Sequence, residues 1–88
     1  MKIAGCVFRQ SEIQINNENT FAARYRKRTI YVSSEHGFGK AKEPGKTRFY
    51  QEVYGDDGIY DMECYNDFHN IEEAVINTLE GAGLAKNN

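Results

Sequence analysis

The chain has 88 residues and a formal net charge of −2, with 27% charged and 40% hydrophobic residues. This length fits one small domain, so residues 1–88 are expected to fold as a single unit. Six tyrosines and five phenylalanines beside a single proline argue against disorder. No hydrophobic run approaches the ~20 residues of a membrane-spanning helix, and the first residues lack a signal-peptide core. We therefore expect a cytoplasmic protein that does not bind membranes.

The cysteine content excludes a disulfide-rich scaffold. The chain has two cysteines, Cys6 and Cys64, whereas small secreted domains carry many more. Both lie in alternating hydrophobic stretches, and free cysteine is among the most buried residue types. We expect two buried thiols on strands.

The first half of the chain predicts short strands. Residues 2–9 and 11–16 are two candidates. A third covers residues 29–34, where Ile30 and Val32 alternate with polar residues. Alternation of this kind is typical of a strand with one buried face.

The segment 20–28 fits two structures. A strand would turn Phe21, Ala23 and Tyr25 inward, whereas a helix would place Phe21, Ala22 and Tyr25 on one face. The strand is favoured because β-rich sequence follows at once.

Residues 35–46 contain Gly37, Gly39, Gly45 and Pro44, which are turn and loop residues. A segment of this length without periodicity predicts a long, mobile loop. It also carries lysines, so the loop is basic.

A hairpin follows the loop. Residues 48–54 and 59–65 are rich in aromatic residues that favour strands, and Gly55-Asp56-Asp57-Gly58 between them has turn chemistry. Pairing Tyr54 with Ile59 predicts two faces. One is mostly apolar and would pack on a helix: Phe49, Gln51, Val53, Tyr60, Met62 and Cys64. The other is acidic and rich in tyrosine: Tyr50, Glu52, Tyr54, Ile59, Asp61, Glu63 and Tyr65. Gln51 would need a hydrogen-bond partner on the apolar face.

A helix is predicted over residues 71–80. Asn70 with Glu73 resembles a capping box. Apolar or small residues then recur with helical spacing at Ile71, Ala74, Val75, Thr78, Leu79 and Ala82. Gly81 and Gly83 offer the left-handed conformation that ends a helix, and a frayed tail is expected over 84–88. The elements together predict an α+β domain: a small antiparallel sheet of about four or five strands with one C-terminal amphipathic helix packed on one face.

Charge is distributed unevenly along the chain. Residues 1–50 hold ten Lys or Arg and four Asp or Glu, whereas residues 51–88 hold one Lys and nine acids. The basic half suggests nucleic-acid binding, in which cations neutralise phosphates and nearby rings stack on bases. The candidate residues are Arg24, Arg26, Arg28, Lys40, Lys42, Lys46 and Arg48. The pI near 5.6 of the whole chain weighs against this reading.

The acidic hairpin suggests a protein interface instead. Tyrosine combines large contact area with a hydrogen-bonding tip, and acids attract a basic partner. The candidate residues are Tyr50, Tyr54, Asp56, Asp57, Asp61, Glu63 and Tyr65. The partner would be another protein or a second copy of this chain.

Catalytic and metal-binding motifs fail on spacing. Gly45-Lys46-Thr47 lacks the first glycine of a phosphate loop, and a strand follows where that motif needs a helix. The potential zinc ligands are too far apart in sequence: Cys6, His36, Cys64 and His69. The aspartates of the predicted turn do not match a calcium loop.

No cofactor or metal is therefore expected. The leading prediction is a small, non-catalytic binding module of regulatory or inhibitor type, with RNA or single-stranded DNA binding through 24–48 as the alternative. A small enzyme, for example with Cys64 and His69 as nucleophile and base, is a third alternative without a supporting motif.

Overall fold

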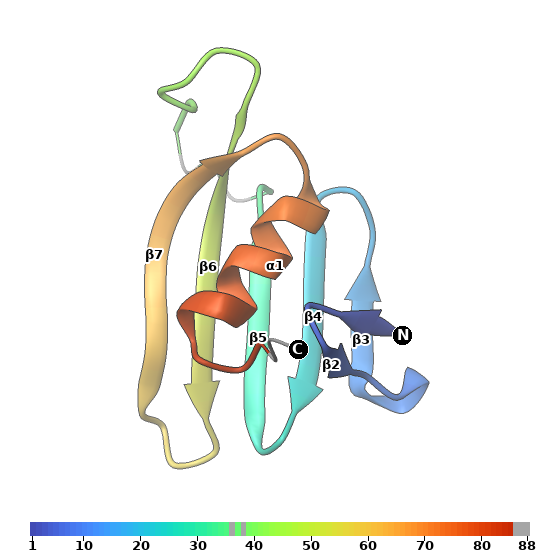
Figure 1. The fold of residues 1–88 in the computed structure, drawn as a ribbon. Coiled ribbons are helices and arrows are strands. Elements are labelled where there is room, and N and C mark those ends of the chain that lie inside the picture. Colours follow the sequence, from blue (N-terminus) through green and yellow to red (C-terminus); the bar gives the residue numbers. More distant parts are fainter. Residues whose placement is uncertain (36, 38, 86–88) are drawn as a thin grey trace.

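A computed structural model of the chain describes residues 1–35, 37 and 39–85. Five strands form one antiparallel sheet in the order β3-β4-β5-β6-β7. The strands are β3 (Ile13–Asn16), β4 (Thr20–Tyr25), β5 (Arg28–Ser33), β6 (Thr47–Gly55) and β7 (Tyr60–Phe68). Helix α1 (Ile71–Gly81) crosses one face of the sheet (Figure 1). The predicted α+β fold with one C-terminal helix is confirmed.

The N-terminal segment differs from the prediction. Instead of one strand over 2–9, β1 (Lys2–Ile3) and β2 (Cys6–Val7) form a separate two-stranded hairpin. Ala4 and Gly5 turn the chain with φ values of 50° and 81°. The 3₁₀ helix η1 (Gln10–Glu12) replaces the start of the strand predicted over 11–16.

The ambiguity over 20–28 is resolved in favour of strands. β4 contains Phe21, Ala23 and Tyr25, which are buried as the alternation predicts. Arg26 and Lys27 form the turn into β5, both with positive φ. Arg28 therefore begins the next strand and does not continue β4.

The hydrophobic core lies between the sheet and α1. Its largest fully buried side chains include Phe8, Phe21, Phe49, Ile30 and Leu79. Phe8 follows β2 and packs its ring edge-on against that of Phe21, with centroids 5.7 Å apart. The N-terminal hairpin thus closes the core beside α1.

The helix ends as predicted from its sequence. The Asn70 side chain accepts a hydrogen bond from the Glu73 backbone nitrogen at 2.9 Å, as an N-cap should. At the other end, Gly83 has φ 75°, and the Leu84 nitrogen donates to the Leu79 carbonyl at 2.9 Å. Together with the bond from the Gly83 nitrogen to the Glu80 carbonyl at 3.1 Å, this bond forms a Schellman motif. Leu84 also accepts from the Cys6 thiol at 3.0 Å, whereas residues 86–88 of the predicted frayed tail lie outside the described residues.

Gln51 joins the sheet to α1. Its side chain is fully buried, and its amide nitrogen donates to Asn77 at 2.8 Å and to Thr78 at 2.9 Å. Its amide oxygen accepts from Asn66 at 2.6 Å. The partner that the sequence requires for Gln51 is therefore present, and it is on the helix.

Replacing Gln51 by Ala should lower the free energy of unfolding by about 2–4 kcal/mol, because it opens a cavity and removes buried hydrogen bonds. Urea unfolding followed by circular dichroism measures the change. The exposed Gln14 in β3 provides the matched control, Gln14→Ala. Equal effects of the two substitutions would contradict this role for Gln51.

Candidate protein-binding face

The outer face of the sheet, opposite α1, carries tyrosines and glutamates on its last two strands. Cross-strand pairs align Tyr50 with Tyr65, Glu52 with Glu63 and Tyr54 with Tyr60. We call these the Tyr–Glu face: Tyr50, Glu52, Tyr54, Tyr60, Glu63 and Tyr65. The ring centroids of Tyr50 and Tyr65 are 5.1 Å apart, and those of Tyr54 and Tyr60 are 5.3 Å apart. The Tyr31 ring of β5 adjoins Tyr50 at 6.3 Å.

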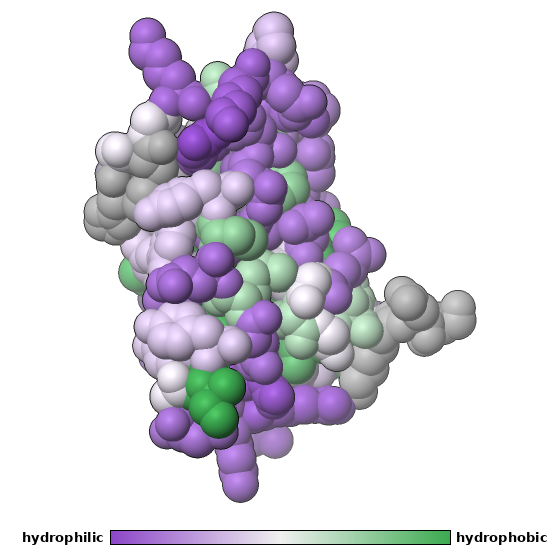
Figure 2. Space-filling view, turned by 90° about the vertical axis from the view of Figure 1, so that its left-hand side faces the viewer, coloured by the Kyte–Doolittle hydropathy of each residue, from purple (hydrophilic) through white to green (hydrophobic). Residues whose placement is uncertain are grey.

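This face is most accessible along β7. Tyr60 is 51% exposed and Tyr65 is 47% exposed, which is unusual for large aromatic side chains. On the β4–β5 side, by contrast, Thr20 and Ser33 are buried and hydrogen-bond each other at 2.8 Å. Thr20 also donates to Glu35, which follows β5. Figure 2 looks onto the β7 edge and shows hydrophilic and intermediate side chains around hydrophobic patches in the middle and near the lower end of the view.

Two carboxylates compete for one hydroxyl proton at the centre of the face. The Tyr50 hydroxyl lies 3.1 Å from Glu52 Oε1 and 3.0 Å from Glu63 Oε2. Burial raises the pKa of Tyr50, and its hydrogen bonds to Glu63 and Glu52 raise it further. The hydroxyl therefore stays protonated and donates to one glutamate at a time.

Glu52 influences Tyr60 in the same way. Its negative charge raises the pKa of Tyr60, with further contributions from burial and from a hydrogen bond to Glu52. Phenol donors thus surround the two carboxylates without neutralising them.

Glu52 and Glu63 differ from Asp56, Asp61 and Asp67, which form ion pairs with arginines at the ends of the sheet. Among the residues that the structure describes, none of the ion pairs includes either glutamate. They lie directly opposite each other on neighbouring strands, an arrangement that destabilises a sheet when the charges are alike.

The predicted register of the hairpin is wrong: from Thr47 to Val53, each residue of β6 pairs two positions further along β7 than pairing Tyr54 with Ile59 would give. A bulge between Val53 and Tyr54 pairs Val53 with Met62 and leaves Asp61 as the extra residue. Tyr60, predicted to face the helix, therefore lies opposite Tyr54 on the outer face. Asp61, predicted for the tyrosine-rich face, instead pairs with Arg28 at 2.8 Å.

The other predicted interface acids lie in the turn that joins β6 to β7. Asp56 forms an ion pair with Arg24 at 2.7 Å, and its backbone nitrogen donates to the Lys27 carbonyl. The hydrogen bond from Arg24 lowers the pKa of Asp56. Asp57 accepts from the Ile59 nitrogen at 3.0 Å and so shapes the turn.

The seven cations proposed for nucleic-acid binding fall into two groups at opposite ends of the sheet (Figure 1). Arg24, Arg26 and Arg28 lie near the β4–β5 turn, where Arg24 and Arg28 are paired with acids. Arg26 lies over the Tyr25 ring, 5.2 Å from its centroid.

Lys40, Lys42, Lys46 and Arg48 lie at the other end, on the loop and the start of β6. Lys46 pairs with Glu43 at 2.8 Å, and Arg48 pairs with Asp67 at 3.3 Å.

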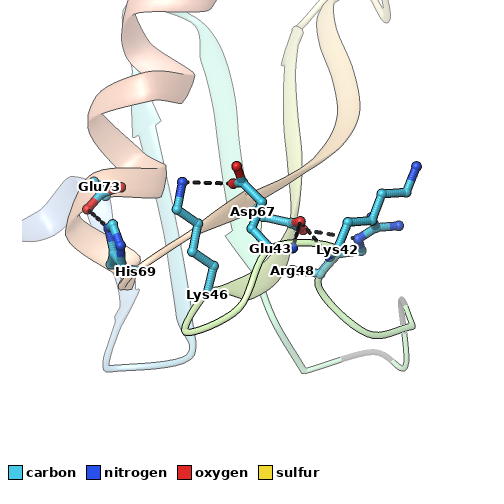
Figure 3. A network of polar contacts seen from close by, with 7 residues as sticks. All are labelled: Lys42, Glu43, Lys46, Arg48, Asp67, His69 and Glu73. Carbon is cyan, nitrogen blue, oxygen red and sulfur yellow. Dashed lines mark hydrogen bonds and ion pairs between the residues drawn. The ribbon is translucent and has the colours of Figure 1, made fainter.

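Asp67 fastens the loop to the end of β7 (Figure 3). One of its oxygens accepts from the backbone nitrogens of Lys42, at 2.7 Å, and Glu43, at 3.4 Å. The other accepts from Arg48. Burial alone would raise the pKa of Asp67, but the bonds from Lys42, Arg48 and Glu43 together lower it. The loop mobility predicted over 35–46 remains a prediction, and positions 36 and 38 lie outside the described residues.

Cys64 and His69 have different partners. The Cys64 thiol lies 3.5 Å from both the Gln51 oxygen and the Asn66 nitrogen. Burial raises its pKa, which disfavours the reactive thiolate. His69 instead contacts Glu73 at 2.9 Å. Within residues 1–35, 37 and 39–85, no three His, Cys, Asp or Glu side chains gather to hold a metal ion. In the same residues, no helix has the length and hydropathy required to cross a membrane.

Two members of the Tyr–Glu face, Glu52 and Tyr60, and the adjoining Tyr31 are absent from the predicted interface. The alternation around Ile30 and Val32 already places Tyr31 on the outer face. Glu52 lies two residues from both Tyr50 and Tyr54 along one strand, so its side chain shares their face. Alternation could not place Tyr60, because the extra residue Asp61 puts Tyr60 on the face opposite to the one that regular alternation predicts.

Replacing Asp67 by Asn should lower the urea midpoint near pH 6 and lower it by less near pH 2.5. The lowered pKa of Asp67 means that its stabilisation is present above the unfolded-state pKa, about 3.9, and is lost as the pH falls through the folded value. Urea titrations at about pH 6 and about pH 2.5 measure this. Glu18→Gln, at an exposed turn, is the control, and a pH-independent difference would contradict the assignment.

Comparison with known proteins gives no relative from which a function can be transferred. No family model, no curated protein and no solved structure matches this chain.

Proposed function

We propose that this chain is a small, non-catalytic binding domain that recognises a basic protein through the Tyr–Glu face. The observation that carries the proposal is the opposed pair Glu52 and Glu63, which lies among accessible tyrosine rings and outside the ion pairs of the described residues. A lysine or arginine side chain satisfies both parts of this surface. It neutralises a carboxylate and stacks its cation on an aromatic ring.

Repulsion between the two glutamates gives the partner a specific role. A bound lysine or arginine relieves the repulsion between Glu52 and Glu63. Binding of the cation therefore stabilises the folded domain. Functional sites often carry such a local cost to stability.

Nucleic-acid binding is the weaker proposal. Its candidate cations are divided between two ends of the sheet, and Arg24, Arg28, Lys46 and Arg48 are engaged with acids. A phosphate backbone would have to displace these ion pairs.

A binding panel tests the two proposals. Fluorescence anisotropy would compare a Lys/Arg-rich peptide, an acidic peptide, a mixed-sequence single-stranded RNA and a DNA duplex, at about 50 and about 200 mM salt. Of these four ligands, we expect only the Lys/Arg-rich peptide to bind. The double variant Tyr54→Ala/Glu63→Gln should weaken its affinity by about tenfold or more, whereas Glu72→Gln on α1 should not. Salt-sensitive RNA binding without peptide binding would instead favour the nucleic-acid proposal.

Glu63→Gln alone should increase the free energy of unfolding of the unbound domain by about 0.2–1 kcal/mol, because it removes a like-charge pair. Thermal and urea unfolding measure the gain. Glu18→Gln, at an exposed turn outside the helix, serves as the control for loss of one negative charge. A loss of stability in Glu63→Gln would show that the opposed glutamates do not repel in the folded state.

A further inference from the structure

β7 is a long, open edge of the sheet. It has nine residues and pairs with β6 on one side. In the described part of the chain, no strand pairs with its other side. Nine residues span about 30 Å, and the unpaired backbone groups of an edge strand are a template for another strand. The opposite edge, β3, is shorter, with four residues.

The two sides of β7 would present different chemistry to an added strand. Glu63 and Tyr65 belong to the outer face, whereas Met62 and Cys64 lie on the side of α1 and are partly buried. Side chains of an added strand alternate between the same two sides. The matching segment therefore alternates Lys or Arg, toward the Tyr–Glu face, with small or apolar residues, toward Met62 and Cys64.

The charge of the edge selects against a second β7. Asp61 and Asp67 on this strand are paired with arginines, whereas Glu63 lies outside the ion pairs of the described residues. Pairing two copies with their Glu63 residues opposed would bring two like charges together. Like charges across a strand pair are destabilising. A basic segment has the complementary charge.

The far end of the edge is hollowed. A groove of about 440 Å³ runs beside residues 65–68 and is bounded by the loop residues Lys42 and Glu43, by Arg48 on β6 and by Asn77 on α1. The groove therefore lies between the loop and this end of β7.

We propose that β7 binds an extended basic segment of a partner protein as a sixth strand of the sheet, with its cations over the Tyr–Glu face. This rests on the proposed function, whose ligand class it specifies. Backbone hydrogen bonds to β7 supply affinity, and the alternating side chains supply specificity.

Three synthetic peptides test the proposal. The first has about ten residues that alternate Lys and Thr, enough to follow the edge. The second has the same sequence with every other backbone nitrogen methylated, so that one edge of the peptide cannot donate hydrogen bonds. The third carries the methyl groups on the remaining nitrogens, so that the opposite edge cannot donate. Titrations use the full chain and its variants Glu63→Lys and Glu72→Lys, and amide hydrogen exchange is followed by NMR with and without the first peptide.

We expect the unmethylated peptide to slow exchange of unpaired β7 amides by about tenfold or more. One methylated peptide should lose about tenfold in affinity relative to the other, and Glu63→Lys should weaken binding while Glu72→Lys does not. If the peptide binds and shifts the Tyr–Glu face without added β7 protection or dependence on methylation, the sixth strand is overturned and the proposed function stands. No binding overturns both. A dimer with β7 protected before peptide is added would identify a second copy as the occupant and also overturn the proposal.

Discussion

A five-stranded sheet has two faces, and α1 covers one of them. The position of α1 decides which side chains of the sheet are buried and which face outward. Gln51 reaches from the buried face of β6 to Thr78 on α1, and its amide oxygen holds Asn66 on β7. A buried polar group with every hydrogen bond satisfied specifies one arrangement of its neighbours. The helix is therefore held on this side, and the tyrosines and glutamates of β6 and β7 are left facing outward.

The basic first half and the acidic second half of the sequence form ion pairs with each other in the folded protein. Acids of the second half of the chain meet arginines of the first half at both ends of the sheet, as Arg24 with Asp56 and Arg48 with Asp67 show. The pair of Arg24 with Asp56 is exposed, and an exposed pair contributes little to stability, whereas Asp67 is largely buried. The larger effect of these pairs is on recognition, because they reduce the positive field of the basic segment and leave Glu52 and Glu63 as acids outside these pairs.

Local patterns in the sequence were enough to predict the helix, its cap at Asn70, the strand character of residues 20–25 and the need of Gln51 for a partner. Each depends on residues close in sequence or on alternation along one strand. The bulge at Asp61 depends instead on how two strands match in length, so the sequence placed Tyr60 on the wrong face. Ion pairs such as Arg28 with Asp61 join positions 33 residues apart, and composition alone cannot assign them. The interface prediction therefore included the tyrosines correctly as outward residues of β6 and β7 but included acids that the fold uses elsewhere.

The bulge also bears on how copies of this protein behave at high concentration. A flat, regular edge of nine residues would let chains add one after another, as strands do in a fibril. An extra residue increases the local twist of its strand, and Asp61 introduces that twist near the first residues of β7. Each added copy would then have to match a twisted edge as well as its negative charge. The same residue that complicates the register thus disfavours growth of an endless sheet, while a short, flexible segment can still follow the strand.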